Sequence, residues 1–222
     1  MGTISVNKLG GLALMFAPVI TLIFYFLQPG GSFIDAADPA DGTATIVAMV
    51  SNAGLGKAVS IVIPIGLLVF LSGILVLQEN IRSNGNGGAL SRIAVLFILV
   101  GIIGWVVSSG ASLAITGSTL ATDQAVALNA SLYSATLGIG TVAGILWGIG
   151  TLALALAIST REDSNKIAAL VAAAMAVVAI VVTIIGGLDT AQLEVMTQIT
   201  GISFIVHVVW FFMLGRSLSQ SE

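Results

Sequence analysis

Six long apolar stretches, separated by shorter polar segments, constrain this chain more than any other feature of its sequence. A helix that crosses the hydrocarbon core of a bilayer needs about 20 apolar residues. Only 8% of the residues are charged, against roughly 25% in soluble domains. We therefore predict an all-α membrane protein that forms one domain. Its transmembrane helices are expected at 8–27, 57–77, 92–115, 133–158, 167–185 and 197–214.

The first apolar stretch is interpreted as a transmembrane helix and not as a cleaved signal peptide. It follows Lys8, as the apolar part of a signal peptide would, but residues 9–27 are long enough to span. No clear small-x-small cleavage site follows it directly. We therefore count it as the first of the six spans.

Basic residues are concentrated in alternate connecting segments. The N-terminus, segments 79–92 and 159–166, and the C-terminus contain six of the seven bases: Lys8, Arg82, Arg92, Arg161, Lys166 and Arg216. Segments 28–56, 118–132 and 186–196 contain the acids Asp35, Asp38, Asp41, Asp123, Asp189 and Glu194, with Lys57 at their border. Cytoplasmic loops are enriched in Lys and Arg. Both termini are therefore predicted to be cytoplasmic, and five or seven spans would break this segregation.

The one histidine, His207, lies within the sixth predicted helix. Counting about 1.5 Å per residue from Arg216 places it near the middle of the bilayer. Ionisable residues at this depth are costly and often functional. His207 is therefore a candidate proton relay, axial ligand or substrate contact. The alternative is a neutral imidazole bonded to a hydroxyl or backbone carbonyl of a neighbouring helix.

Aromatic and hydroxyl side chains mark a candidate ligand pocket. Tryptophan usually lies at the membrane interface, yet Trp105 and Trp147 are predicted deep within helices three and four. Trp210 is one turn from His207. In helix three, Ser109 and Ser112 share a face with Trp105. These residues are expected either to line an apolar pocket for a lipid or another hydrophobic ligand, or simply to fill gaps between helices.

The fourth predicted helix carries a stripe of glycines at every fourth position: Gly140, Gly144 and Gly148. Because helices in lipid associate through close packing of small residues, this helix is predicted at the centre of the bundle. The alanines of the fifth helix offer a matching face. A homodimer surface is the alternative use of the stripe.

The sequence lacks the residues that several classes of catalytic and binding site require. There is no cysteine, and we find no nucleophile–base pair, phosphate-binding loop or paired carboxylates within a span. No basic tract is present that would bind nucleic acid. The aspartates at 35, 38 and 41 do not have calcium-loop spacing. Asn129-Ala130-Ser131 is a glycosylation sequon in a segment predicted to lie outside.

Two short segments and one long loop carry a family resemblance. They are residues 8–14 (KLGGLAL), the long outer first loop, and residues 73–77 (GILVL) ahead of Arg82. Together they resemble an uncharacterised prokaryotic family of six-span membrane proteins, known only as a domain of unknown function. The resemblance implies a multi-pass protein of a prokaryotic plasma membrane. That family has no assigned activity, so the resemblance assigns no functional residue.

The leading functional hypothesis is a non-catalytic membrane subunit or scaffold. Such a protein packs against other membrane proteins, or a second copy of itself, or binds an apolar ligand or lipid. No cofactor or metal is predicted. The second hypothesis is a small transporter or channel that uses the polar stripe of helix three and His207. A third is an intramembrane enzyme in which His207 acts with an external cofactor.

Overall fold

The computed structural model describes residues 4–83 and 87–221, which form an all-α bundle. Six helices are long and apolar enough to cross a membrane. They are α1 (Val6–Phe26), α3 (Ala53–Ser83), α4 (Gly88–Thr116), α5 (Thr122–Ser159), α6 (Lys166–Leu188) and α7 (Leu193–Gln220). A short helix, α2 (Gly42–Ser51), and a 3₁₀ turn at Thr190–Gln192 complete the described elements. The predicted six-span fold is confirmed, and the chain is a multi-pass integral membrane protein.

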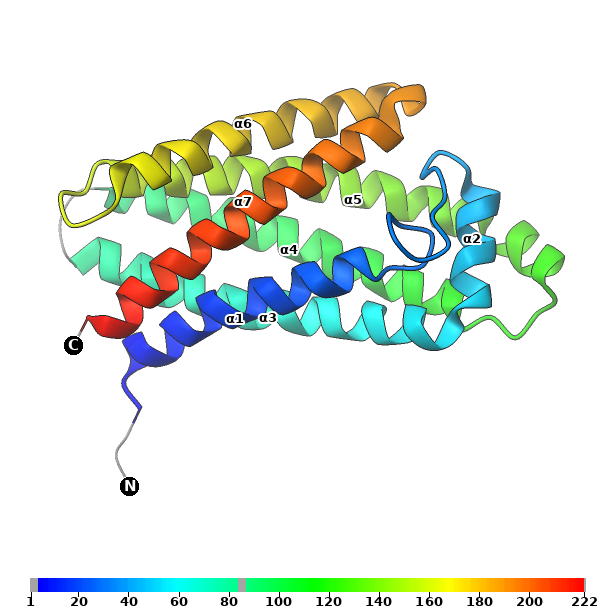
Figure 1. Ribbon diagram of the computed structural model, residues 1–222, viewed down its shortest axis with the longest axis horizontal. Helices are drawn as coiled ribbons and strands as arrows, with labels where there is room; N and C mark the ends of the chain where they lie inside the picture. Colours follow the sequence, from blue (N-terminus) through cyan, green and yellow to red (C-terminus); the bar gives the residue numbers. More distant parts are fainter. Residues whose placement is uncertain (1–3, 84–86, 222) are drawn as a thin grey trace.

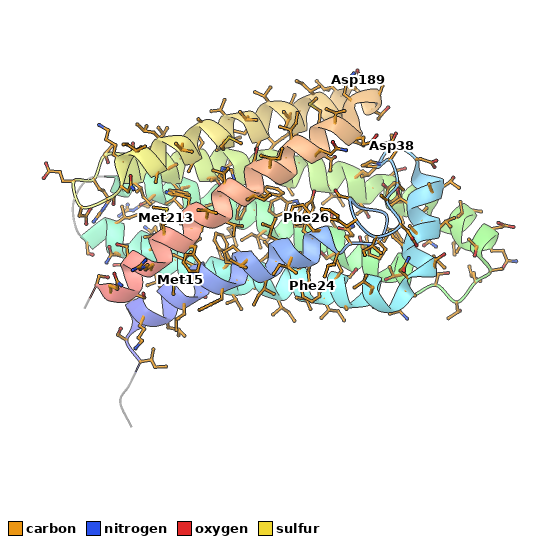
Figure 2. All side chains as sticks on the ribbon, in the orientation of Figure 1. Met15, Phe24, Phe26, Asp38, Asp189 and Met213 are labelled. Carbon is orange, nitrogen blue, oxygen red and sulfur yellow. The ribbon has the colours of Figure 1, made fainter. Side chains whose placement is uncertain are left out.

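The two ends of the bundle differ. Both termini lie at one end, which we call the terminal end, and α2 lies at the opposite, distal end (Figure 1). The amide of Asn7 donates to the carbonyl of Ser221 at 3.0 Å, which holds the two ends of the chain together. Asp38 and Asp189 lie toward the distal end, whereas Met15 and Met213 lie in the terminal half (Figure 2). The acidic and basic connecting segments therefore occupy opposite ends.

The six spans form a ring in chain order. Each span packs against the spans that precede and follow it, and α1 closes the ring by packing against both α3 and α7. Short connections make consecutive helices antiparallel neighbours. Closure between the first and last helices is a tertiary contact that no loop imposes.

Glycines allow α1 to close the ring at the terminal end. A Cβ added at Gly11 would lie 2.5 Å from the carbonyl oxygen of Gly215 in α7. On the other side of α1, a Cβ added at Gly73 of α3 would lie 2.8 Å from the carbonyl oxygen of Gly10. Only small residues permit such close backbone approach. Gly10, Gly11 and Gly73 all belong to the two segments that carry the family resemblance.

Helix α5 packs closely on both of its neighbours through different glycines. A Cβ at Gly150 would lie 2.7 Å from the backbone nitrogen of Ile98 in α4. A Cβ at Gly148 would lie 2.6 Å from Cγ1 of Ile180 in α6. The structure therefore places α5 against α6, as the sequence predicts, and also against α4. The prediction that this helix lies at the centre of the bundle is wrong, because α5 is one of six spans in a closed ring.

The terminal half of the ring is filled by side chains. Large side chains from five spans are fully buried there: Leu14, Ile74, Ile81, Ile98, Leu154, Ile158 and Phe211. Small residues of α6, including Ala169 and Ala172, complete this core. Over the described residues, the centre of the terminal half is therefore tightly packed.

Helix α2 crosses the distal end, transverse to the spans (Figure 1). The carboxylate of Asp41 caps it by accepting from the backbone N–H of Ala44 at 2.9 Å. Its buried face, Ile46 and Met49, packs against Ile115 of α4 and Tyr133 of α5. The apolar face of α2 is therefore covered by protein.

The predicted span boundaries require correction, chiefly in α5. This helix begins at Thr122, not Tyr133, so most of the predicted 118–132 loop is helical. Its 38 residues correspond to about 57 Å, well beyond a hydrocarbon core of about 30 Å. Hydropathy marks only the part of a helix that lies in lipid. The first turns of α5 continue beyond it, and α5 packs against α2.

Candidate functional site

The distal half of the ring contains a partly open cavity of about 610 Å³. Residues of all six spans border it, together with α2 and the 28–41 segment that leads into it. Ligand cavities in proteins typically measure roughly 300–1,000 Å³. The bundle is thus hollow in one half and packed in the other.

Five aromatic side chains form the floor of the cavity, which we call the aromatic floor: Phe70, Trp105, Trp147, Phe204 and Phe211. They come from α3, α4, α5 and α7 and meet across the ring. The centroids of Phe70 and Phe211 are 4.7 Å apart, and those of Trp105 and Trp147 are 5.2 Å apart. Tilted and edge-on contacts at such distances are favourable. The aromatic floor separates the cavity from the packed terminal half.

Hydroxyl groups of α4 lie along one wall. Ser108, Ser109 and Ser112 all border the cavity. The Ser108 hydroxyl also donates to the carbonyl of Thr136 in α5 at 3.2 Å, which joins the two helices. Gly140 and Gly144 of α5 also border the cavity and carry no side chain that would fill it. The nearest atom to a Cβ added at Gly140 is Oγ of Ser108, at 4.0 Å.

His207 borders the cavity and is only 1% exposed. Its Nε2 lies 3.2 Å from the backbone carbonyl of Ala172 in α6. A carbonyl only accepts, so Nε2 carries the hydrogen, and Nδ1 of the neutral ring keeps its lone pair. This bond matches the structural alternative stated for His207. Nδ1, however, has no hydrogen-bond partner within the described residues.

Trp147 presents a second buried polar atom without a partner. Its ring belongs to the aromatic floor and is 7% exposed, and its Nε1–H meets no acceptor in the described part of the chain. Leaving a buried polar atom unpaired costs about 1–3 kcal/mol. His207 and Trp147 both border the cavity, and the two unpaired nitrogens themselves are buried.

The mouth of the cavity is polar and acidic. Asp38 from the 28–41 segment and Glu194 from the start of α7 border it, and both are exposed. Of the described residues that border the cavity, none is lysine or arginine. The 28–41 segment is held over the mouth by Tyr133, whose hydroxyl donates to the carbonyl of Pro39 at 2.8 Å.

The structure brings most of the predicted pocket residues to one cavity. These are His207, Trp105, Trp147, Ser109 and Ser112, joined by Gly140 and Gly144 of the glycine stripe. Trp210 is a correction, because it points into the terminal core beside Phe211 and does not border the cavity. Trp210 lies one helical turn from His207 toward the terminal end, below the aromatic floor. Gly148 serves the contact with α6 instead.

Sequence reasoning missed three members of the aromatic floor: Phe70, Phe204 and Phe211. A signal existed for two of them, because residues three before and four after His207 lie on its face of a helix. Phe204 and Phe211 occupy those positions. Phe70 has no comparable neighbour in the sequence and is identified only by the packing of α3.

The asparagine of the predicted glycosylation sequon is buried in the structure. Asn129 lies inside α5, is buried, and donates from its side-chain amide to the carbonyl of Ala125 at 2.8 Å. Glycosylated asparagines lie on exposed surfaces. The amide of Asn129 is not accessible in this fold. Within residues 4–83 and 87–221, no group of three His, Asp or Glu residues is placed to hold a metal ion.

Comparisons with protein-family models, curated proteins and solved structures found no match to this chain. The resemblance to an uncharacterised six-span family therefore stays a prediction.

Proposed function

We propose that this protein is a non-catalytic integral membrane protein that binds an apolar ligand in its distal cavity. One observation carries the proposal, which is that the ring is hollow above the aromatic floor and packed below it. A helix bundle that served only as a scaffold gains dispersion energy by filling such a space. Apolar walls with a few placed polar groups are typical of ligand sites.

A matched pair of glycine substitutions in α5 tests this function. Leucine in Gly140→Leu would extend into the cavity without backbone conflict, since its Cβ meets only Ser108 at 4.0 Å. Leucine in Gly138→Leu would extend from the exposed side of the same helix, where a Cβ meets nothing within 4 Å. Both changes replace glycine by the same residue two positions apart.

Organic extracts of the purified protein, analysed by mass spectrometry, give the readout. We expect wild type and Gly138→Leu to retain a near-stoichiometric apolar compound through purification in mild detergent, and Gly140→Leu to lose it. If wild type retains no such compound, or if Gly140→Leu retains as much as Gly138→Leu, the proposed function is wrong.

The subunit and transporter hypotheses are narrower proposals beside this one. The serine wall of α4 favours transport, because it gives the cavity a partly polar lining. Movement across the membrane would require the aromatic floor to open. Liposome flux with His207→Ala and Ser109→Leu tests this idea, which fails if no flux exists or if neither variant changes it. Binding of a protein subunit would appear as co-purification of a partner.

We further propose that both termini face the cytoplasm of a prokaryotic cell. The distribution of bases supports this orientation, since six of seven lie in the segments of the terminal end. The cavity would then open toward the outer leaflet.

A further inference from the structure

The cavity changes from apolar to polar between its floor and its mouth. The aromatic floor closes one end, and Leu67 and Ile63 of α3 border the cavity about one and two helical turns from Phe70 toward the distal end. Polar side chains border it in the 28–41 segment and in the first turns of α7: Gln28, Ser32, Asp38, Glu194 and Gln198. Glu194 and Phe204 are ten residues apart in α7, which separates them by about 15 Å along the helix axis. This depth suits a ligand with an apolar chain and a polar head, with the head at the mouth.

The charged side chains at the mouth have one sign. Of the described residues that border the cavity, Asp38 and Glu194 carry a formal charge and none is lysine or arginine. Four further acids of the distal connecting segments have the same sign without bordering the cavity: Asp35, Asp41, Asp123 and Asp189. Lys57, the base at the border of these segments, does not border the cavity either. An anionic head would be repelled at the mouth, whereas a cationic head would be attracted.

Several hydroxyl groups of the cavity lining have already used their hydrogen. Four threonines that border the cavity donate to the backbone carbonyl four residues earlier in their own helix: Thr21, Thr136, Thr141 and Thr200. Ser108 donates to the carbonyl of Thr136 in the same way across two helices. A hydroxyl whose hydrogen is in use has only lone pairs left to offer. These five groups therefore cannot donate to an anion, and this agrees with the charge at the mouth.

We propose that the cavity binds an amphipathic cation, with its apolar chain on the aromatic floor and its ammonium head at the mouth beside Asp38 and Glu194. This inference rests on the proposed ligand-binding function and specifies the chemistry of the ligand. Long-chain amines and alkyl quaternary ammonium compounds belong to this class. The chain gains by leaving water for the apolar part of the cavity. The head stays hydrated at the open mouth, so no charge has to be buried.

Three compounds with the same alkyl chain separate the effect of charge from apolar binding. They are dodecyltrimethylammonium, dodecanol and dodecanesulfonate, which are cationic, neutral and anionic. Binding of the tritiated form of each compound is measured on purified protein held on scintillation beads in a nonionic detergent, with Gly140→Leu defining non-specific partitioning. The affinity for one compound is always compared between protein variants, so the partitioning of that compound into micelles cancels.

Asp38→Asn and Glu194→Gln together remove the charge at the mouth and keep the shape of both side chains. The amide oxygen of asparagine can still accept from the backbone N–H of Ala40, as the Asp38 carboxylate does at 2.8 Å. Attraction between exposed charges is weak, so the double variant should bind dodecyltrimethylammonium about threefold to 25-fold more weakly than wild type. It should bind dodecanol within about twofold of wild type and dodecanesulfonate no more weakly than wild type.

Asp123→Asn is the matched control for the loss of charge. Asp123 is exposed in the first turn of α5 and does not border the cavity. This variant should bind all three compounds within about twofold of wild type. Salt gives a second readout, because raising the ionic strength from about 0.01 M to about 1 M shortens the Debye length from about 30 Å to about 3 Å. Relative to dodecanol, the cation should lose affinity for wild type and for Asp123→Asn over this range, and lose less for the double variant.

The outcomes distinguish this inference from the function beneath it. If none of the three compounds binds to wild type above the Gly140→Leu level, the ligand-binding function itself is wrong. If dodecanol binds but the double variant keeps the full affinity for dodecyltrimethylammonium, the function stands and the cation inference is wrong. An equal loss of the cation and of dodecanol would also overturn it, because the two side chains would then act through the shape of the mouth. If the double variant fails to fold, the wild-type salt series decides, and a cation affinity that does not change with salt relative to dodecanol contradicts the inference.

Discussion

Gly150→Ala tests whether close backbone contact holds α4 against α5. The added Cβ would lie 2.7 Å from the backbone nitrogen of Ile98 and 2.9 Å from the carbonyl oxygen of Ala94. Neither atom can rotate away, so the helices must separate by about 0.5 Å or more. A gap of that size loses roughly a quarter or more of the local dispersion attraction. Dispersion is the main attraction between helices in lipid.

The expected loss of stability follows from two opposing effects. Overpacking costs about 1–3 kcal/mol, and we take the upper value because both contacts are with backbone. Replacing glycine by alanine in a helix returns up to about 1 kcal/mol. The net loss is about 2 kcal/mol, which lowers the Tm of a chain of this length by about 4–8 °C.

Gly138→Ala is the matched control, because a Cβ there meets nothing within 4 Å. It should keep or slightly raise the Tm. Thermal unfolding of both variants in the same mild detergent, followed by circular dichroism, gives the comparison. If Gly150→Ala unfolds within about 1 °C of wild type, close contact at this glycine does not hold the two helices together.

Three further predictions concern the loops and the core. Because the chain has no cysteine, Thr119→Cys and Glu162→Cys each provide a single thiol. A membrane-impermeant thiol reagent applied to intact cells should label Thr119→Cys and not Glu162→Cys. Labelling of Glu162→Cys alone would show that the proposed orientation is reversed. Arg161 donates to Asp163 through two nitrogens, and this contact lowers the pKa of the Asp163 carboxyl below 3.8. The contribution of this contact to the stability of the protein is present above pH 3.8 and is lost as the pH falls through the lowered pKa of Asp163 in the folded state. The Tm difference between wild type and Asp163→Asn should therefore shrink from about pH 7 to about pH 3. A Tm difference that stays constant over this range would contradict the prediction. The buried hydroxyl of Thr151 has no partner in the described structure, so Thr151→Val should raise stability by about 1 kcal/mol, and a lower Tm would show an unseen partner.

The candidate site could be predicted in part. Trp105, Trp147 and His207 stand out because such residues are unusual within a span, and the fold places all three around one cavity. Trp210 satisfied the same criterion and faces the terminal core instead. Sequence distance along a helix fixes depth and face within that helix. It does not fix how far each face lies from the centre of the ring.

The number and approximate position of the spans followed from the sequence alone, because lipid offers backbone groups no partner and so forces every apolar stretch of sufficient length into a helix. Helix ends did not follow, since α5 continues for 11 residues before the predicted Tyr133, through a stretch whose Asp123, Gln124 and Asn129 lower its hydropathy. The ring closure of α1 on α7, the packed terminal half and the hollow distal half were decided only by the tertiary structure. They depend on which small residues meet across helices, as Gly11 and Gly215 do. They depend equally on which aromatic rings meet in the centre, as Phe70 and Phe211 do. Such meetings join residues far apart in the chain, and no local pattern encodes them.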